Sequence, residues 1–150
     1  MAAISDHFTW EEATVTNQRD PATGLALPNK PGPEESANLV HTFQEMEKVR
    51  ALLGKPILVH SAYRSPEVNK AVGGAAHSQH MQGEAVDFSV PGLTIREVFK
   101  RLRPSTINYD QLIEEAGTWV HISFVHGGRS ARRQGLAMRV MNGKATYVPA

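Results

Sequence analysis

Two histidines and one aspartate in this 150-residue chain have the residue types and the placement of a metal-binding site. Asp87 lies within a predicted strand, residues 84–90, and alternates with apolar residues that form its buried face. His121 alternates in the same way with the apolar residues of a second predicted strand. Both polar side chains are therefore expected on the sheet face opposite the core, where His80, from the adjoining loop, can join them.

A set of two imidazoles and one carboxylate suits zinc, because three protein ligands leave a fourth position open for water. A single histidine on a strand is more often an ordinary polar residue, and most other histidines of the chain are interpreted in that way. Asp87 is harder to explain without a ligand, because aspartate is disfavoured in strands and a buried carboxylate needs partners. His77 lies in the same loop as His80 and remains the alternative to it as a ligand.

Around these residues the sequence resembles the D-Ala-D-Ala carboxypeptidase family of zinc peptidases, most of all its short phage and prophage members. Three segments carry the resemblance: Ser61-Ala62-Tyr63-Arg64-Ser65, Ser78-x-His80-x-x-Gly83-x-Ala85-x-Asp87 and Trp119-Val120-His121-Ile122-Ser123. The resemblance implies a small α+β domain of the type shared with hedgehog-type zinc domains. It also implies that His80, Asp87 and His121 bind Zn²⁺.

The function implied by the resemblance is zinc-dependent hydrolysis of a peptide bond in the peptidoglycan stem peptide. The enzyme is expected to be a D-Ala-D-Ala carboxypeptidase or a peptidoglycan endopeptidase, acting as a phage or prophage endolysin. Arg64 is expected to bind a substrate carboxylate, for which its planar bidentate fork is suited. Ser78 is expected either to bind substrate or to brace its loop.

Two other functions compete with this interpretation. One is a metal-containing cell-wall-binding module that has lost its catalytic activity. The other is a non-haem iron oxygenase, because two histidines and one carboxylate also suit Fe(II). The oxygenase is disfavoured because the chain has too few strands and Asp87 follows His80 by seven residues rather than two.

Hydrolysis also needs a general base, and the sequence leaves two candidates. Some relatives carry an acidic residue three positions before the last histidine ligand, where this chain has Thr118. The resemblance places the acidic residue of the short members at Glu115. A three-residue hairpin loop would pair Glu115 with Trp119 and bring it to the face of His121, whereas a two-residue loop would bring Glu114 there. Glu115 is the preferred base.

The elements that must position these residues are predicted to form one α+β domain over residues 1–150. Helices are predicted over residues 34–53, 67–72 and 94–103, and strands over 56–60, 84–90, 107–115, 119–125 and 138–148. The last strand region is interrupted by Asn142-Gly143, the favoured two-residue hairpin turn. Two or three helices are expected to pack on a small, mainly antiparallel sheet.

The composition excludes several kinds of site chemistry and of partner. The chain has no cysteine, which excludes disulfide scaffolds, cysteine-ligated metals and thiol nucleophiles. No apolar run approaches the ~20 residues of a membrane helix, and the amino terminus does not resemble a signal peptide. We expect a monomer made soluble in the host cytoplasm that acts on the cell wall after release. The C-terminal tail is basic but lacks interleaved aromatic residues, so no nucleic-acid partner is expected. Its five basic residues are Arg129, Arg132, Arg133, Arg139 and Lys144.

Overall fold

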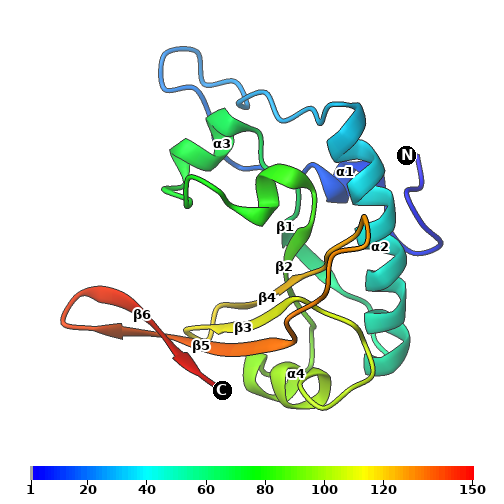
Figure 1. The fold of residues 1–150 in the computed structure, drawn as a ribbon. Helices are drawn as coiled ribbons and strands as arrows, with labels where there is room; N and C mark the ends of the chain where they lie inside the picture. The colour runs from blue at the N-terminus through cyan, green and yellow to red at the C-terminus, as the bar shows by residue number, and fades with distance from the viewer. Residues whose placement is uncertain (1) are drawn as a thin grey trace.

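One sheet of six strands organises residues 2–150, which are the residues that the computed structural model describes (Figure 1). The strands are β1 (Leu58–Ser61), β2 (Ala85–Ser89), β3 (Gln111–Glu115), β4 (Trp119–Ser123), β5 (Gln134–Met141) and β6 (Lys144–Pro149). Their order across the sheet is β1-β2-β4-β3-β5-β6, and neighbours are antiparallel except for β3 and β5. The predicted α+β class with a mainly antiparallel sheet is confirmed.

The helices begin and end at the residues whose types favour helix boundaries. They are α1 (Trp10–Ala13), α2 (Pro33–Leu53), α3 (Pro66–Ala71), α4 (Ile95–Leu102) and the 3₁₀ helix η1 (Gln79–Gln82). Proline occupies the first turn of α2, and Gly54 ends it in the left-handed conformation. Thr94 and Glu97 form the expected capping box of α4. No helix within residues 2–150 combines the length and the apolar character needed to cross a membrane.

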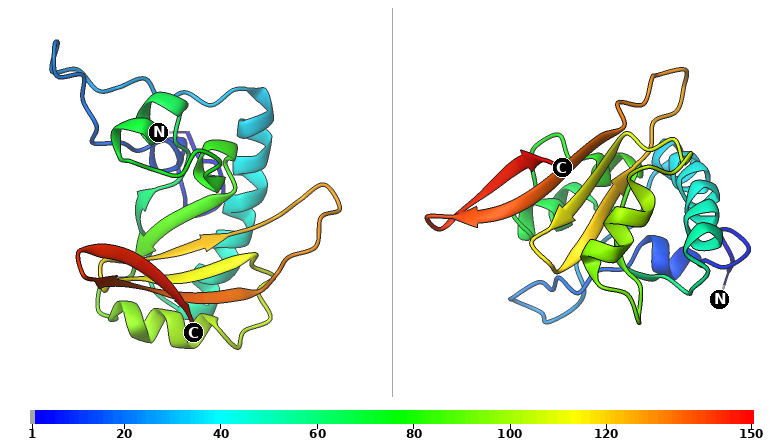
Figure 2. Two further views of the ribbon diagram at one scale, coloured as in Figure 1. Left: turned by 60° about the vertical axis from the view of Figure 1, so that its left-hand side comes forward. Right: turned by 90° about the horizontal axis from the view of Figure 1, so that it is seen from below.

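The hydrophobic core lies between one face of the sheet and the helices α2 and α4 (Figure 2). Phe43 and Met46 of α2 and Val98 of α4 belong to the same buried cluster as Phe88 of β2 and Ile122 of β4. Since alternate residues of a strand face opposite sides, this packing leaves the residues between the apolar ones on the other face. Asp87 and His121 are therefore directed away from the core.

The structure corrects the sequence-based boundaries at three places. His80 lies within η1, not in an irregular loop. β5 begins at Gln134, four residues before the predicted strand, because residues 134–138 pair in parallel with residues 111–115 of β3. The parallel pair joins segments that are distant in sequence, and a local alternation pattern does not reveal it. Residues 107–110 were expected to belong to β3 but precede it.

The basic tail is partly used to hold the chain between β4 and β5 against the rest of the molecule. Arg129 pairs with the buried Glu84, and Arg132 pairs with Asp110. The guanidinium of Arg133 lies 4.6 Å from the centre of the Tyr109 ring. Arg129, Arg132 and Arg133 thus all contact other parts of the chain.

Candidate metal centre and active site

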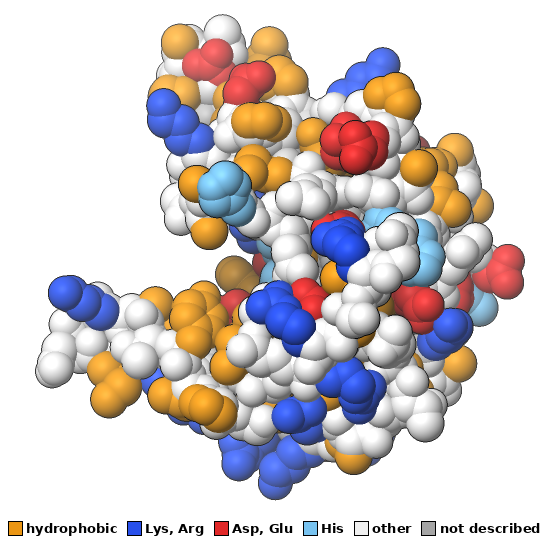
Figure 3. Space-filling view, viewed as in Figure 1, with side chains coloured by type: hydrophobic (Ala, Val, Ile, Leu, Met, Phe, Trp, Pro, Cys, Tyr) orange, Lys and Arg blue, Asp and Glu red, His pale blue; other side chains and the backbone are white. Residues whose placement is uncertain are grey.

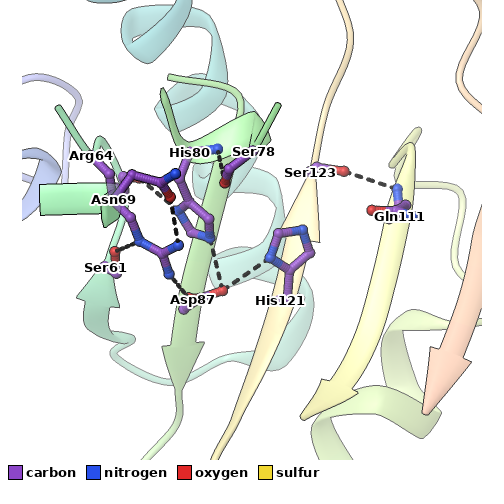
Figure 4. A network of polar contacts seen from close by, with 10 residues as sticks. Ser61, Arg64, Asn69, Ser78, His80, Asp87, Gln111, His121 and Ser123 are labelled. Carbon is purple, nitrogen blue, oxygen red and sulfur yellow. Dashed lines mark hydrogen bonds and ion pairs between the residues drawn. The ribbon is translucent and has the colours of Figure 1, made fainter. Parts of the chain in front are cut away.

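Asp87 and His121 lie directly opposite each other on the neighbouring strands β2 and β4. Nδ1 of His121 is 3.0 Å from Oδ1 of Asp87 (Figure 4). The sheet register alone therefore brings together the two strand residues that the sequence proposed as ligands.

His80 reaches the same carboxylate oxygen from η1. Its Nε2 lies 3.2 Å from Oδ1 of Asp87, and its side chain is almost fully buried. The donor atoms of His80, Asp87 and His121 all lie within 4.8 Å of one another. His77 is exposed at the rim of the cavity and is not part of this group.

Gly83 makes the bend that connects η1 to β2. Its φ of 75° is in the left-handed region, and a Cβ there would lie 2.7 Å from the carbonyl oxygen of Glu35 on α2. The hydroxyl of Thr42, also on α2, donates to the carbonyl oxygen of Gly83 at 2.7 Å. Helix α2 thus anchors the turn that delivers His80 to the sheet.

The hydrogen bonds of the His80 imidazole fit a bound cation. Nδ1 of His80 donates to the carbonyl oxygen of Ala62 at 2.7 Å, so in the neutral ring Nε2 bears a lone pair facing Asp87. Burial lowers the pKa of His80, which disfavours the doubly protonated ring. Nε2 of His80 and Oδ1 of Asp87 are then two acceptors that face each other, an arrangement that a metal ion between them would stabilise. The hydrogen bond to Ala62 is the kind of outer-shell contact that orients a ligating histidine.

His121 and Asp87 complete a donor set of the kind that zinc binds. Among residues 2–150, no hydrogen-bond partner exists for the buried Nε2 of His121, and its Nδ1 faces Asp87. Burial of Asp87 opposes ionisation, but His80 and His121 hold the pKa of its carboxyl far below the usual range. An ionised carboxylate and two imidazole nitrogens match the oxygen and nitrogen ligands of Zn²⁺.

Arg64 contacts the second oxygen of the same carboxylate. Its Nη2 donates to Oδ2 of Asp87 at 3.1 Å, and its Nε donates to the hydroxyl of Ser61 at 3.2 Å. Only 15% of the Arg64 side chain is exposed. The guanidinium therefore fixes the carboxylate of Asp87 by a hydrogen bond. It also lines the cavity beside the candidate ligands.

Ser78 caps η1 at its amino end. Its hydroxyl accepts a hydrogen bond from the backbone N–H of His80 at 3.2 Å. The residue also lines the cavity, so its hydroxyl braces η1 and is at the same time partly accessible beside the ligands.

The β3–β4 hairpin distinguishes the two glutamates. Its loop has three residues, and Glu115 pairs with Trp119. Glu115 consequently shares the face of His121 and lines the cavity. Glu114 lies on the core face, where it is 8% exposed and its Oε2 is 3.5 Å from Nη1 of Arg96.

A cavity of about 640 Å³ lies over the site face of the sheet. It is also lined by residues that the sequence did not identify as site residues: Gln111, Ile113, Arg132, Leu136 and Tyr147. Leu136 and Tyr147 come from the C-terminal hairpin β5–β6. The Asn142-Gly143 turn predicted this hairpin, but only the pairing of β5 with β3 places it beside the metal ligands.

A comparison with known protein families places the chain in a family of peptidases. Residues 6–123 match the sequence model described as peptidase M15. This range contains all three candidate ligands, Arg64 and Glu115, and it ends with β4, before β5 and β6. No curated protein matches the chain.

Proposed function

The chain belongs to the peptidase M15 family of zinc-dependent metallopeptidases, and from this premise we propose that it hydrolyses a peptide bond in the peptidoglycan stem peptide. The observation that carries the proposal is the convergence of His80, Asp87 and His121 at the floor of an open cavity. We propose that it acts as a phage or prophage endolysin, a monomer that reaches the cell wall after release from the cytoplasm.

His80, Asp87 and His121 are the residues that would hold zinc. When bound, zinc supplies Lewis-acid chemistry, which polarises a carbonyl group and acidifies water in the open coordination position. The protein fixes the orientation of each ligand: Ala62 holds His80, and Arg64 holds Asp87.

Glu115 is the general base of the proposed mechanism. Ile113 of β3 lies opposite His121 of β4. Glu115, two residues further along β3, is therefore diagonal to His121 on the site face, with a typical separation of about 7–8 Å between the two residues. Burial raises the pKa of Glu115, which moves the carboxyl toward the range in which it can both accept and return a proton near neutrality. Glu115 takes a proton from the attacking water and gives it to the departing nitrogen.

Arg64 and Ser78 contribute the proposed substrate contacts. Ser61, Asn69 and Asp87 occupy part of the Arg64 guanidinium, and its remaining N–H groups are available to a carboxylate or carbonyl of the stem peptide. The hydroxyl of Ser78 accepts one hydrogen bond and remains free to donate another toward the cavity.

The test combines metal analysis with digestion of purified cell walls. The expected result is about one Zn²⁺ per chain and the release of soluble muropeptides whose masses identify a cleaved peptide bond. Removal of zinc by a chelator should stop the release, and added zinc should restore it. A protein that holds zinc and binds walls without cleaving them would instead be a cell-wall-binding module.

A further inference from the structure

Arg132 is a second arginine in the cavity of the metal centre. Among the described residues that line this cavity, Arg64 and Arg132 are the two that carry a guanidinium. Arg132 lies between β4 and β5, beyond residue 123, where the match to the peptidase family ends. No role for this cation follows from the family assignment, so its contacts decide what it can do.

Asp110 holds one edge of the Arg132 guanidinium. Nε of Arg132 donates to Oδ1 of Asp110 at 3.0 Å, and Nη2 donates to Oδ2 at 2.7 Å. The backbone N–H of Arg132 donates to the same Oδ1 at 2.9 Å. Asp110 is itself buried, and Nε2 of Gln79 donates to its Oδ2 at 3.0 Å. Both the backbone and the side chain of Arg132 are therefore fixed before a ligand arrives.

The other edge of the guanidinium is open to the cavity. Among residues 2–150, the N–H groups of Nη1 have no hydrogen-bond acceptor, and Nη2 keeps a second N–H besides the one that Asp110 accepts. The Arg132 side chain is 55% exposed and lines the cavity, so these groups are available to a ligand there. Parallel N–H groups in a planar fork fit a carboxylate. Since the arginine is already fixed, binding costs little side-chain entropy.

Arg64 and Arg132 lie on opposite sides of the proposed ligands. Arg64 donates to Asp87 of β2 and to a serine of β1, whereas Asp110, which holds Arg132, directly precedes β3. The strand order β1-β2-β4-β3-β5 places Asp87 and His121 between the two cations. Strands β2 and β3 are two spacings apart, on the order of 10 Å, which is the length of about three extended residues.

The surface leaves room for a peptide at this position. Figure 3 shows a hollow between the part of the molecule that carries α3 and the projecting β5–β6 hairpin, with Lys and Arg side chains over the β4–β5 segment at its edge. A peptide bound over the metal centre can therefore place a carboxylate a few residues from the reacting bond against Arg132.

We propose that Arg132 binds a carboxylate of the substrate at a position separate from the bond that is cut. This inference rests on the peptide hydrolysis proposed above and adds a determinant of specificity to it. A stem peptide offers this chemistry in two places, the side carboxylate of an acidic residue and the carboxylate at the C-terminus. Amidation removes the charge and one acceptor oxygen, so the enzyme discriminates between the acid and the amide form of the group that Arg132 binds.

Three synthetic stem peptides test the proposal: one has both carboxylates free, and each of the others has one of them amidated. Steady-state kinetics with zinc-loaded protein gives KM and kcat for each peptide. One of the two amidations should raise KM about tenfold in the wild type, which corresponds to about 1.4 kcal/mol, with little change in kcat. In Arg132→Lys the same amidation should raise KM by less than about twofold. The amidation with this behaviour identifies the carboxylate.

Arg132→Lys is chosen because it separates binding from folding. Its ammonium keeps a cation beside Asp110, but lysine has no second nitrogen to present to the substrate. Arg139→Gln is the control, since it removes an exposed cation outside the cavity and should keep the wild-type effect of both amidations. If both amidations affect Arg132→Lys as they affect the wild type, the inference is wrong.

Binding to Glu115→Gln gives a readout that does not depend on cleavage. The peptides stay intact in this variant, and calorimetry should show about a tenfold difference in Kd between the acid and the amide form. Adding Arg132→Lys should remove the difference, and an unchanged difference would overturn the inference. Failure of the zinc-loaded wild type to cut any peptide or purified walls, with the Kd difference present, would overturn the proposed hydrolysis and leave the carboxylate site standing.

Discussion

Arg64 contacts only one of the two carboxylate oxygens of Asp87. Nη2 of Arg64 donates to Oδ2 of Asp87 at 3.1 Å, while Oδ1 faces the imidazoles of His80 and His121 at 3.2 and 3.0 Å. The oxygen nearest the imidazoles is therefore the one left free for a metal ion. The guanidinium fixes which oxygen that is.

Replacement of Arg64 by alanine should weaken zinc binding by about 10–100-fold, the usual effect of removing an outer-shell partner. Arg64→Lys should keep zinc and the fold but lose activity, because a point charge does not reproduce the planar fork. Competition with a chelator measures the affinity. Arg96→Ala, which removes an exposed side chain that contacts Glu114 on the other face of the sheet, should bind zinc normally. Unchanged affinity in Arg64→Ala would mean that Asp87 keeps its orientation without the guanidinium.

Alanine at His80, Asp87 or His121 should abolish the retention of zinc through gel filtration, since each removes one of three ligands. His77→Ala should retain about one Zn²⁺ per chain, because His77 is exposed and lies outside the ligand group. Loss of zinc in His77→Ala together with retention in His80→Ala would reverse the ligand assignment.

Glu115→Gln should keep zinc and the fold but lower kcat by at least about 10²-fold, the low end for general acid–base catalysis. Glu114→Gln should stay within a few-fold of the wild type in kcat, because its side chain lies on the opposite face of β3. Steady-state kinetics on the same peptide compare the two. Equal activity in both variants would place the base elsewhere in the cavity.

The shared face of Asp87 and His121 and the β3–β4 hairpin were predictable because they depend on local patterns. Asp87 and His121 each alternate with apolar residues, and this alternation assigns a side chain to one face whatever the neighbouring strand is. The position of Glu115 depended on one further quantity, the length of the β3–β4 loop. The sequence allowed two or three residues, and the structure has three.

The far wall of the cavity was not predictable from the same patterns. Tyr147 reaches the site face because β6 pairs with β5, and β5 pairs with β3, which is more than twenty residues earlier. Contacts between strands distant in sequence depend on which edge is free after the local hairpins have formed, and no single segment encodes that. Arg132 was identified only as part of a basic tail, although it holds Asp110.

The Asp110–Arg132 pair should make stability depend on pH in the acid range. Hydrogen bonds from Arg132 hold the pKa of Asp110 below its ordinary value, which is about 3.9 in an unfolded chain. The pair therefore contributes fully above about pH 4, and its contribution is lost as the pH falls through the lower pKa of the folded state.

Asp110→Asn should lower the free energy of unfolding by about 1–2 kcal/mol at pH 7 and by much less near pH 2. Urea unfolding at the two pH values measures the difference. Glu45→Gln, which removes the exposed pair with Lys48, should cost less than about 0.5 kcal/mol at either pH. A deficit of equal size at both pH values would mean that the amide disturbs packing rather than charge.

The pairing of β5 with β3 also bears on self-association. Without β5, strand β3 would end the sheet with an open row of backbone donors and acceptors, which is the feature that promotes edge-to-edge aggregation. β5 covers the edge of β3, and β6 becomes the outer strand, with Lys144 at its start and Pro149 at its end. Lysine and proline are residues with which natural sheets blunt their edges. The β5–β6 hairpin, which lines the cavity, thus also keeps the edge of β3 from pairing with other chains. Mutations that detach the hairpin should therefore first lower the solubility of the protein.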